Sequence, residues 1–197
     1  MLFYPNFYCN SVRDVKLDLL EQNNIKGIIL DVDNTLIDFY RQFEEGTLEW
    51  VQTLKNAGIK FCIVSNSNKL DKVKFVAKEL DVPYFHFAKK PFKRGFLKAK
   101  DRMGLKAENI AAIGDQIMTD VVGSNRCKMF SILVKPIKEK DIFITRLKRP
   151  LENWIIKSYL KKQERNEPQS VYKWYKYFLV CRSSNTRIVS RKLPRVG

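Results

Sequence analysis

Short, wholly apolar runs alternate along the first 134 residues with longer stretches whose apolar residues recur every three or four positions. The short runs predict buried strands at 27–32, 59–65, 85–88, 110–114 and 131–134. The longer stretches predict helices at 47–57, 70–80, 94–103 and 120–126. Apolar strands separated by helices indicate parallel pairing with both sheet faces covered. The expected fold is therefore a doubly wound, Rossmann-like α/β sheet, in which ligands bind at the carboxyl ends of the strands.

The pattern changes after Pro136. Residues 141–162 have apolar positions on one helical face, basic residues on the other, and Pro150 as a break or helix start. We therefore predict three parts: an α/β core over 1–137, a basic amphipathic helical extension over 138–167, and a basic aromatic tail over 168–197. The apolar face of the extension suits packing against the core, and its basic face suits an anionic bilayer.

The positive charge is concentrated near the end of the chain. The formal net charge is +16, and residues 135–197 carry 17 Lys and Arg against 5 Asp and Glu. Such a segment suits an anionic lipid, a nucleic acid or an acidic protein, and it equally suits a solvated helix face. Nucleic acid is the less favoured partner, because aromatic residues that can stack on bases gather only at 172–178.

Several classes of protein are excluded by what the chain lacks. His86 is the only histidine, so a His-pair metal site cannot form. It lies in the aromatic stretch YFHF, where we expect it to pack, so we do not expect a Ser-His triad either. The four cysteines have no paired spacing, which is typical of reduced thiols in a cytosolic protein. No run of about eighteen apolar residues is present, so we expect no transmembrane span. The prediction is a cytoplasmic protein, with peripheral contact on the inner face of a membrane as a further expectation.

Charged or polar side chains follow four consecutive predicted strands at their carboxyl ends. They are Asp31 and Asp33, then Ser65 and Asn66, then Lys89 and Lys90, and finally Asp115 with Asp120. Because the carboxyl ends of parallel strands meet at one edge, we expect these groups to lie close together. Buried like charges require a counter-ion, so a structural role alone does not account for this set.

Phosphoryl transfer is the chemistry that uses such a set. Asp31, at the end of its strand, is placed to attack phosphorus and form an aspartyl-phosphate. Asp33 is placed to protonate the leaving oxygen and then to deprotonate the attacking water. Ser65 and Asn66 are candidate phosphate ligands, and Lys90 supplies fixed positive charge. Thr35 is expected to stabilise the turn that follows Asp33.

The same acids predict a metal site. Mutual repulsion among Asp31, Asp33 and Asp115 is relieved by a hard divalent cation, for which we predict Mg²⁺. The cation also shields an anionic phosphate from an anionic nucleophile.

The strings DVDNTL, VSNS, KKP and GDQIMTD, in this order, resemble the four motifs of haloacid dehalogenase (HAD) superfamily phosphatases. More closely, residues 3–160, with GDQIMTDVVGSNRCKM and FITRLKRPLEN, resemble the YqeG family of subclass IIIA. That family includes enzymes that dephosphorylate phosphatidylglycerophosphate to phosphatidylglycerol. The resemblance implies a HAD-type fold and a magnesium-dependent phosphatase.

The resemblance also implies individual roles. The nucleophile is Asp31, the acid/base is Asp33, and Asp115 holds the metal with support from Asp120. Ser65 and Lys90 bind phosphate. Only the lysine directly before Pro91 matches the motif, so Lys90 is preferred and Lys89 remains an alternative.

Spacing carries information on substrate size. One helix uses most of the residues between Asp33 and Ser65, and another uses most of those between Ser65 and Lys90, so we expect no cap domain. An open site admits bulky substrates. Three hypotheses follow: a phosphatase for an anionic phospholipid, above all phosphatidylglycerophosphate; a phosphatase for soluble small phosphomonoesters; and a non-enzymatic polyanion-binding protein. The intact acids in every motif count against the last.

Overall fold

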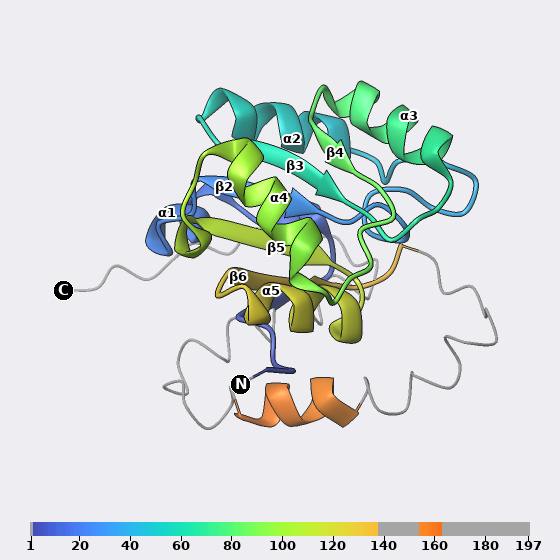
Figure 1. Cartoon of the computed structure of the whole chain (residues 1–197). Helices are drawn as coiled ribbons and strands as arrows, with labels where there is room; N and C mark the ends of the chain where they lie inside the picture. Colours follow the sequence, from blue (N-terminus) through green and yellow to red (C-terminus); the bar gives the residue numbers. More distant parts are fainter. Residues whose placement is uncertain (1, 138–153, 163–197) are drawn as a thin grey trace, which may run out of the picture. The chain divides into compact units, whose positions relative to one another are not determined.

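The computed structural model describes residues 2–137 and 154–162. Its centre is a six-stranded parallel sheet with the strand order β1-β6-β5-β2-β3-β4 (Figure 1). The strands are β1 (Phe7–Cys9), β2 (Gly27–Leu30), β3 (Lys60–Val64), β4 (Tyr84–Phe85), β5 (Ile110–Gly114) and β6 (Phe130–Val134). The expected doubly wound parallel sheet is therefore confirmed.

Helices connect the strands on both faces of the sheet. They are α1 (Leu17–Gln22), α2 (Thr47–Asn56), α3 (Leu70–Leu80), α4 (Lys93–Met103) and α5 (Val122–Arg126), with short turns η1 (Val12–Asp14), η2 (Ala107–Asn109) and η3 (Ile117–Val121). Figure 1 shows α2 and α3 on the side of the sheet away from α4 and α5. In the connection between β2 and α2, residues 31–46, the only strand-like pairings are two isolated bridges. No cap domain is inserted anywhere within residues 2–137.

The central strand β2 is buried on both faces because its side chains alternate between two cores. Ile28 and Leu30 belong to one core, together with apolar residues of α2 and α3 such as Trp50 and Val76. Ile29 belongs to the other core, together with Phe96 of α4 and other apolar residues. Full burial of one such side chain contributes about 1.5–3 kcal/mol. This explains why every side chain of β2 after Gly27 is aliphatic.

The strand order reverses at β2. From it the chain moves outward through β3 and β4 on one side, and returns through β5 and β6 on the other. Leu30 pairs in register with Ile63 of β3 and Ile113 of β5. The three strands therefore end at nearly the same level, and a crevice opens there in doubly wound sheets. The fold thus places the residues after β2, β3 and β5 around a single point.

The structure adds two elements near the N-terminus that the pattern did not predict, β1 and α1. The strand β1 has three residues and lies at the edge of the sheet, so its apolar pattern is too short to stand out. A tertiary contact holds the chain there: Asn6 N–H donates to Ser131 Oγ at 3.0 Å, and Ser131 N–H donates to Asn6 Oδ1 at 2.9 Å. The predicted strand 85–88 also differs, since β4 ends at Phe85 and the chain turns toward the site.

The chain divides into two compact units, Met1–Glu152 and Asn153–Gly197. Within the second unit, residues 154–162 are helical, as the amphipathic pattern predicted for that stretch. Three predictions concern residues outside the described ranges and stay untested. They are the rest of the helical extension, the two boundaries that follow 137 and 167, and the tail 168–197. Among the helices of residues 2–137 and 154–162, none is both long and apolar enough to cross a bilayer.

Candidate active site

A buried ion-paired cluster lies at the carboxyl end of β2. Asp31 directly follows the strand, and its N–H donates to the carbonyl oxygen of Ile113 at 3.0 Å, which extends the sheet by one residue. Lys90 Nζ donates to Asp31 Oδ1 at 2.5 Å and to Asp120 Oδ1 at 2.6 Å. Lys90 is 6% exposed, and both carboxylates are buried. The structure thus joins groups from three different connections in one contact network.

Asp115 completes a set of three acids. One carboxylate oxygen from each of Asp31, Asp115 and Asp120 lies within 4.8 Å of the other two. The hydroxyl of Thr35 lies between two of them, 3.5 Å from Asp31 Oδ2 and 3.4 Å from Asp115 Oδ1. This cluster contains three carboxylates and one ammonium group, and the atoms that could ligate a metal ion are all oxygens. These residues therefore fit a hard divalent cation.

Burial first, and repulsion between neighbouring acids second, raise the pKa values of two of the acids. Burial raises the pKa of Asp31 to about 6, with Asp120 adding to the shift and Lys90 opposing it. Burial and the nearby charges of Asp31 and Asp120 raise the pKa of Asp115 well above its ordinary value. For Lys90, burial acts to lower the pKa, but Asp120 and Asp31 outweigh it and raise the pKa. A second positive charge would favour the ionised form of both carboxyls.

Asp33 lies beside this cluster, outside the set of three acids. Its side chain is 43% exposed, and its carboxylate pairs with Lys72 Nζ from the first turn of α3. Asn34, the next residue, has a φ of 59°, in the left-handed region that asparagine adopts more readily than most residues. The roles of Asp33 as acid/base and as metal ligand remain predictions. In either role, its ion pair with Lys72 would have to break or be shared with the new partner.

Ser65 and Asn66 follow β3 as expected, but their side chains already have partners. Ser65 is 1% exposed, and its Oγ accepts from the N–H of Ser67 at 3.1 Å. Asn66 binds the backbone of Lys90 twice: Nδ2 donates to the carbonyl oxygen at 3.0 Å, and Oδ1 accepts from the N–H at 2.6 Å. Asn66 therefore positions the loop that carries Lys90. Its predicted contact with phosphate remains a prediction.

The structure distinguishes the two adjacent lysines. Lys89 is exposed, has a φ of 54°, and places its ammonium 5.2 Å from the centroid of the Phe87 ring. Lys90, next in the chain, is buried against the acids. The left-handed backbone at Lys89 separates the directions of the two side chains. The structure thus brings Lys90 into the cluster and leaves Lys89 outside it.

The loop after β5 is shaped around Asp120. Its Oδ2 accepts from the N–H of Gln116 at 3.2 Å and from Thr119 Oγ1 at 3.2 Å. A Cβ at position 114 would collide with the carboxylate of Asp120, so only glycine leaves room for this side chain. The sequence singled out Asp120 as a supporting residue, and the structure places it in direct contact with Lys90.

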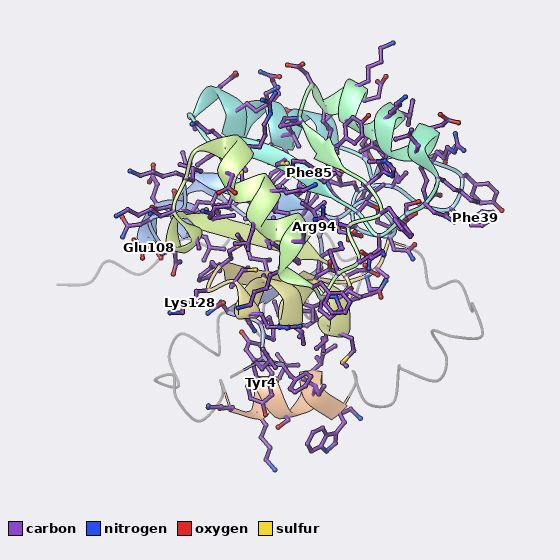
Figure 2. All side chains as sticks on the ribbon, in the orientation of Figure 1. Tyr4, Phe39, Phe85, Arg94, Glu108 and Lys128 are labelled. Atoms are coloured by element: carbon purple, nitrogen blue, oxygen red, sulfur yellow. The ribbon has the colours of Figure 1, made fainter. Side chains whose placement is uncertain are left out.

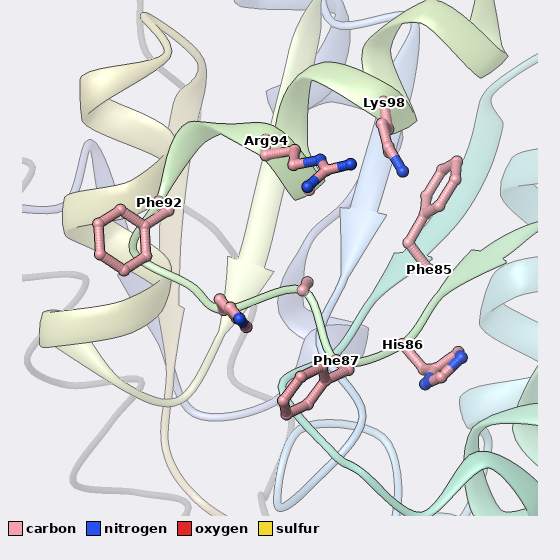
Figure 3. Close-up of a pocket in the computed structure, with 9 residues that line it drawn as sticks. Phe85, His86, Phe87, Phe92, Arg94 and Lys98 are labelled. Carbon is pink, nitrogen blue, oxygen red and sulfur yellow. The ribbon is translucent and has the colours of Figure 1, made fainter.

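A hollow of about 400 Å³ lies beside the Lys90 loop. Residues of β4, the β4–α4 connection and α4 line it, and Figure 3 shows Lys98 beside the ring of Phe85, with Phe87 and Phe92 on the connection between β4 and α4. His86 is among the lining residues. Aromatic rings and cations therefore line this hollow, and the acids of the cluster are not among its lining residues.

Two residues of the site were not predicted from the sequence. Lys72 carries no motif signal, because it is one of several lysines in an amphipathic helix. Only the packing of α3 aims it at Asp33. Thr119 lies inside GDQIMTD, so its position offered a signal, and its contact with Asp120 depends on the π-helical turn η3.

A parallel sheet whose consecutive strand ends carry two aspartates, a serine, a lysine and a further aspartate defines a haloacid dehalogenase-like hydrolase, and residues 41–127 match the family model with that description. The chain is 38% identical over 161 residues to the Bacillus subtilis (strain 168) protein named "Probable phosphatase YqeG", a match that covers 81% of this chain and 93% of that protein. The chain therefore belongs to the YqeG family of HAD phosphatases.

Two further likenesses are weaker. The chain is 26% identical over 169 residues to Phosphatidylglycerophosphate phosphatase 1, chloroplastic/mitochondrial, of Arabidopsis thaliana, which covers 80% of this chain and 48% of that protein. This chain thus spans about half the length of the plant enzyme. A solved HAD hydrolase of subfamily III A from Legionella pneumophila is 25% identical, with a TM-score of 0.42, and the match covers 50% of this chain and 59% of that structure.

Proposed function

We propose that this phosphatase is magnesium-dependent, acts through an aspartyl-phosphate on Asp31, and dephosphorylates phosphatidylglycerophosphate to phosphatidylglycerol. The observation that carries the catalytic part is the buried contact of Asp31 with Lys90 at the carboxyl end of β2, surrounded by Asp115 and Asp120. A carboxylate in this position is held by the strand before it, and its charge is partly offset by Lys90, an ammonium group that also suits a phosphate.

The proposed first step forms a bond between an Asp31 carboxylate oxygen and phosphorus, while the ester P–O bond breaks. The leaving alkoxide takes a proton from Asp33. Lys90 and the hydroxyl of Ser65 stabilise the negative oxygens of the transferred group. In the second step Asp33 removes a proton from water, whose oxygen binds phosphorus and releases Asp31 and inorganic phosphate.

The metal would be held by Asp31 and Asp115, with Asp120 nearby, and Asp33 is a further candidate ligand. Mg²⁺ in this place would supply positive charge that offsets the repulsion between the phosphate and the carboxylates. The raised pKa of Asp31 agrees with this role, since a cation favours the ionised nucleophile.

The lipid substrate is supported by three observations. The site has no cap within residues 2–137, so a headgroup in a bilayer can reach it. The chain carries a net charge of +16, which favours anionic surfaces. A relative that matches 80% of this chain is named a phosphatidylglycerophosphate phosphatase. We further propose that the protein works in peripheral contact with an anionic membrane.

The test is phosphate release by the full chain in the presence of Mg²⁺. Phosphatidylglycerophosphate in mixed micelles is compared with a panel of soluble phosphomonoesters. We expect a strong preference for the lipid, and a loss of roughly a thousandfold or more in Asp31→Asn. Asp101→Asn, an exposed carboxylate of α4, is the matched control and should keep wild-type activity.

Two results would contradict parts of the proposal. Equal or better turnover of a soluble ester would remove the lipid assignment and keep the catalytic site. Wild-type activity of a folded Asp31→Asn variant would remove Asp31 as the nucleophile.

A further inference from the structure

The exposed aromatic side chains of residues 2–137 are concentrated at one edge of the sheet. Within this part of the chain, the large apolar side chains that are more than half exposed are Phe39 (67%), Tyr40 (65%), Phe87 (54%) and Phe92 (63%). The first pair lies in the connection after β2, and the second in the connection after β4. Both connections start at carboxyl ends of parallel strands, which is the edge that holds Asp31.

The first pair is displayed on a preformed turn. Asp38 is buried, and its Oδ1 accepts from the N–H groups of Tyr40 at 2.8 Å and Gln42 at 3.0 Å. The rings of Phe39 and Tyr40 meet edge to face, with centroids 5.6 Å apart. Figure 2 shows Phe39 projecting from the molecule at the end opposite Glu108 and Lys128. A turn of this kind presents its rings with little further loss of conformational entropy on binding.

The second pair is anchored to the site itself. Phe87 N–H donates to the carbonyl oxygen of Ser67 at 3.1 Å, and Phe92 N–H donates to that of Lys89 at 3.0 Å. The two rings line the hollow next to the Lys90 loop, as Figure 3 shows. Any surface that contacts Phe87 and Phe92 therefore lies beside the loop, residues 86–92, that carries Lys90.

Within the two short segments that carry these rings, the exposed charged side chains are all basic, and Asp38, directly before the first segment, is buried. Segments 39–42 and 87–94 contain no Asp or Glu, and they contribute four exposed cations, Arg41, Lys89, Lys93 and Arg94. Aromatic rings beside basic side chains are typical of surfaces that lie in the headgroup region of an anionic bilayer. Each basic residue near such a surface adds about 1 kcal/mol of attraction.

We infer that this edge, defined by Phe39, Tyr40, Phe87 and Phe92 and called here the aromatic edge, docks on an anionic bilayer and turns the catalytic cluster toward the headgroups. The inference rests on the proposed lipid substrate. It moves the membrane contact from the basic C-terminal region, where the amphipathic pattern suggested it, to the edge that carries the nucleophile. Docking and substrate capture then involve the same loops.

The test measures binding of the full chain to vesicles by cosedimentation, with phosphatidylcholine alone and with phosphatidylcholine mixed with phosphatidylglycerol. The variants are Phe39→Ser with Tyr40→Ser, and Phe87→Ser with Phe92→Ser. We expect each pair to weaken binding to the anionic vesicles by roughly tenfold. The pair at 39 and 40 should leave turnover of a soluble phosphomonoester unchanged, because these residues have no role in the proposed catalytic steps.

The matched control is Leu2→Ser with Phe3→Ser. These side chains are 44% and 42% exposed and precede β1, at the opposite edge of the sheet. Wild-type binding by both aromatic variants, or an equal loss in the control pair, would overturn the inference and return the contact to the C-terminal region or to general charge. Vesicle binding that depends on the aromatic edge, in a protein that does not hydrolyse phosphatidylglycerophosphate, would instead reject the proposed substrate alone.

Discussion

At the scale of the residue, the site is defined by an imbalance of charge. Asp31, Asp115 and Asp120 converge while Lys90 is the ammonium that contacts two of them. Desolvation of the acids costs free energy that one ammonium only partly offsets. This arrangement is compatible with a further cation, and it agrees with the proposed binding of a phosphate.

This imbalance predicts how stability depends on pH in the absence of metal. The pKa of Asp31 is raised from 3.8 to about 6, so the folded state binds more protons than the unfolded state between these values. The contribution of Asp31 to stability is therefore greatest below pH 4 and is lost as the pH rises through 6. Asp115 acts in the same direction.

We expect Asp31→Asn to stabilise the metal-free chain at pH 7, by roughly 2 to 3 kcal/mol, because asparagine resembles the protonated acid. The difference from wild type should shrink toward pH 4. Chemical unfolding in EDTA at several pH values measures it, with Asp101→Asn as the exposed control. An equal free energy of unfolding for wild type and Asp31→Asn at pH 7 would contradict the assignment.

At the scale of the element, the β5–η3 connection determines whether Asp120 reaches Lys90. The chain reverses direction within a few residues after Gly114, and the carboxylate of Asp120 occupies the space where a Cβ would lie. The backbone N–H of Gln116 then binds that carboxylate. A small residue at the strand end is thus a requirement of the site, in addition to the acids.

Gly114→Ala should consequently lower turnover by at least tenfold, because Asp120 must move away from Lys90. The matched control is Gly58→Ala. Gly58 has a φ of 86° and no neighbour within 4 Å of the added methyl, so the control is expected to cost about 1 kcal/mol of stability without loss of activity. Phosphate release and thermal unfolding are measured for both variants. Wild-type activity in Gly114→Ala would show that the position of Asp120 is not needed.

At the scale of the whole molecule, the chain combines a net charge of +16 with a proposed catalytic edge that no cap covers within residues 2–137. Long-range attraction then acts on any anionic surface that approaches. Such attraction is screened by salt, since the Debye length falls from about 10 Å at 0.1 M to about 3 Å at 1 M.

Salt should therefore raise the KM for phosphatidylglycerophosphate in anionic vesicles by roughly tenfold or more between low and high ionic strength, with a smaller change in kcat. Initial rates across a salt series measure this, and a soluble phosphomonoester in the same buffers provides the comparison. Parallel changes for both substrates would mean that salt acts on the catalytic site and not on the membrane surface.

Much of the architecture was predictable because it follows from local periodicity. The runs at 27–30 and 61–64 are apolar on both faces, which is typical of a covered parallel strand, and the helix between them has a clear apolar stripe. By contrast, β1 was missed because three residues at a sheet edge carry almost no periodic signal. Its place depends on the contact between Asn6 and Ser131, which are far apart in the sequence.

The sequence by itself determined the parallel sheet and the strand ends that bring Asp31, Ser65, Lys90 and Asp115 to one edge, because strand order and apolar runs are properties of short segments. Only the tertiary structure decided how the side chains at that edge pair. It aims Lys90 at Asp31 and leaves Lys89 outside the cluster, and it places Lys72 on Asp33. These outcomes depend on loop dihedral angles and on the packing of α3 against the sheet, and such long-range geometry leaves no local pattern in the chain.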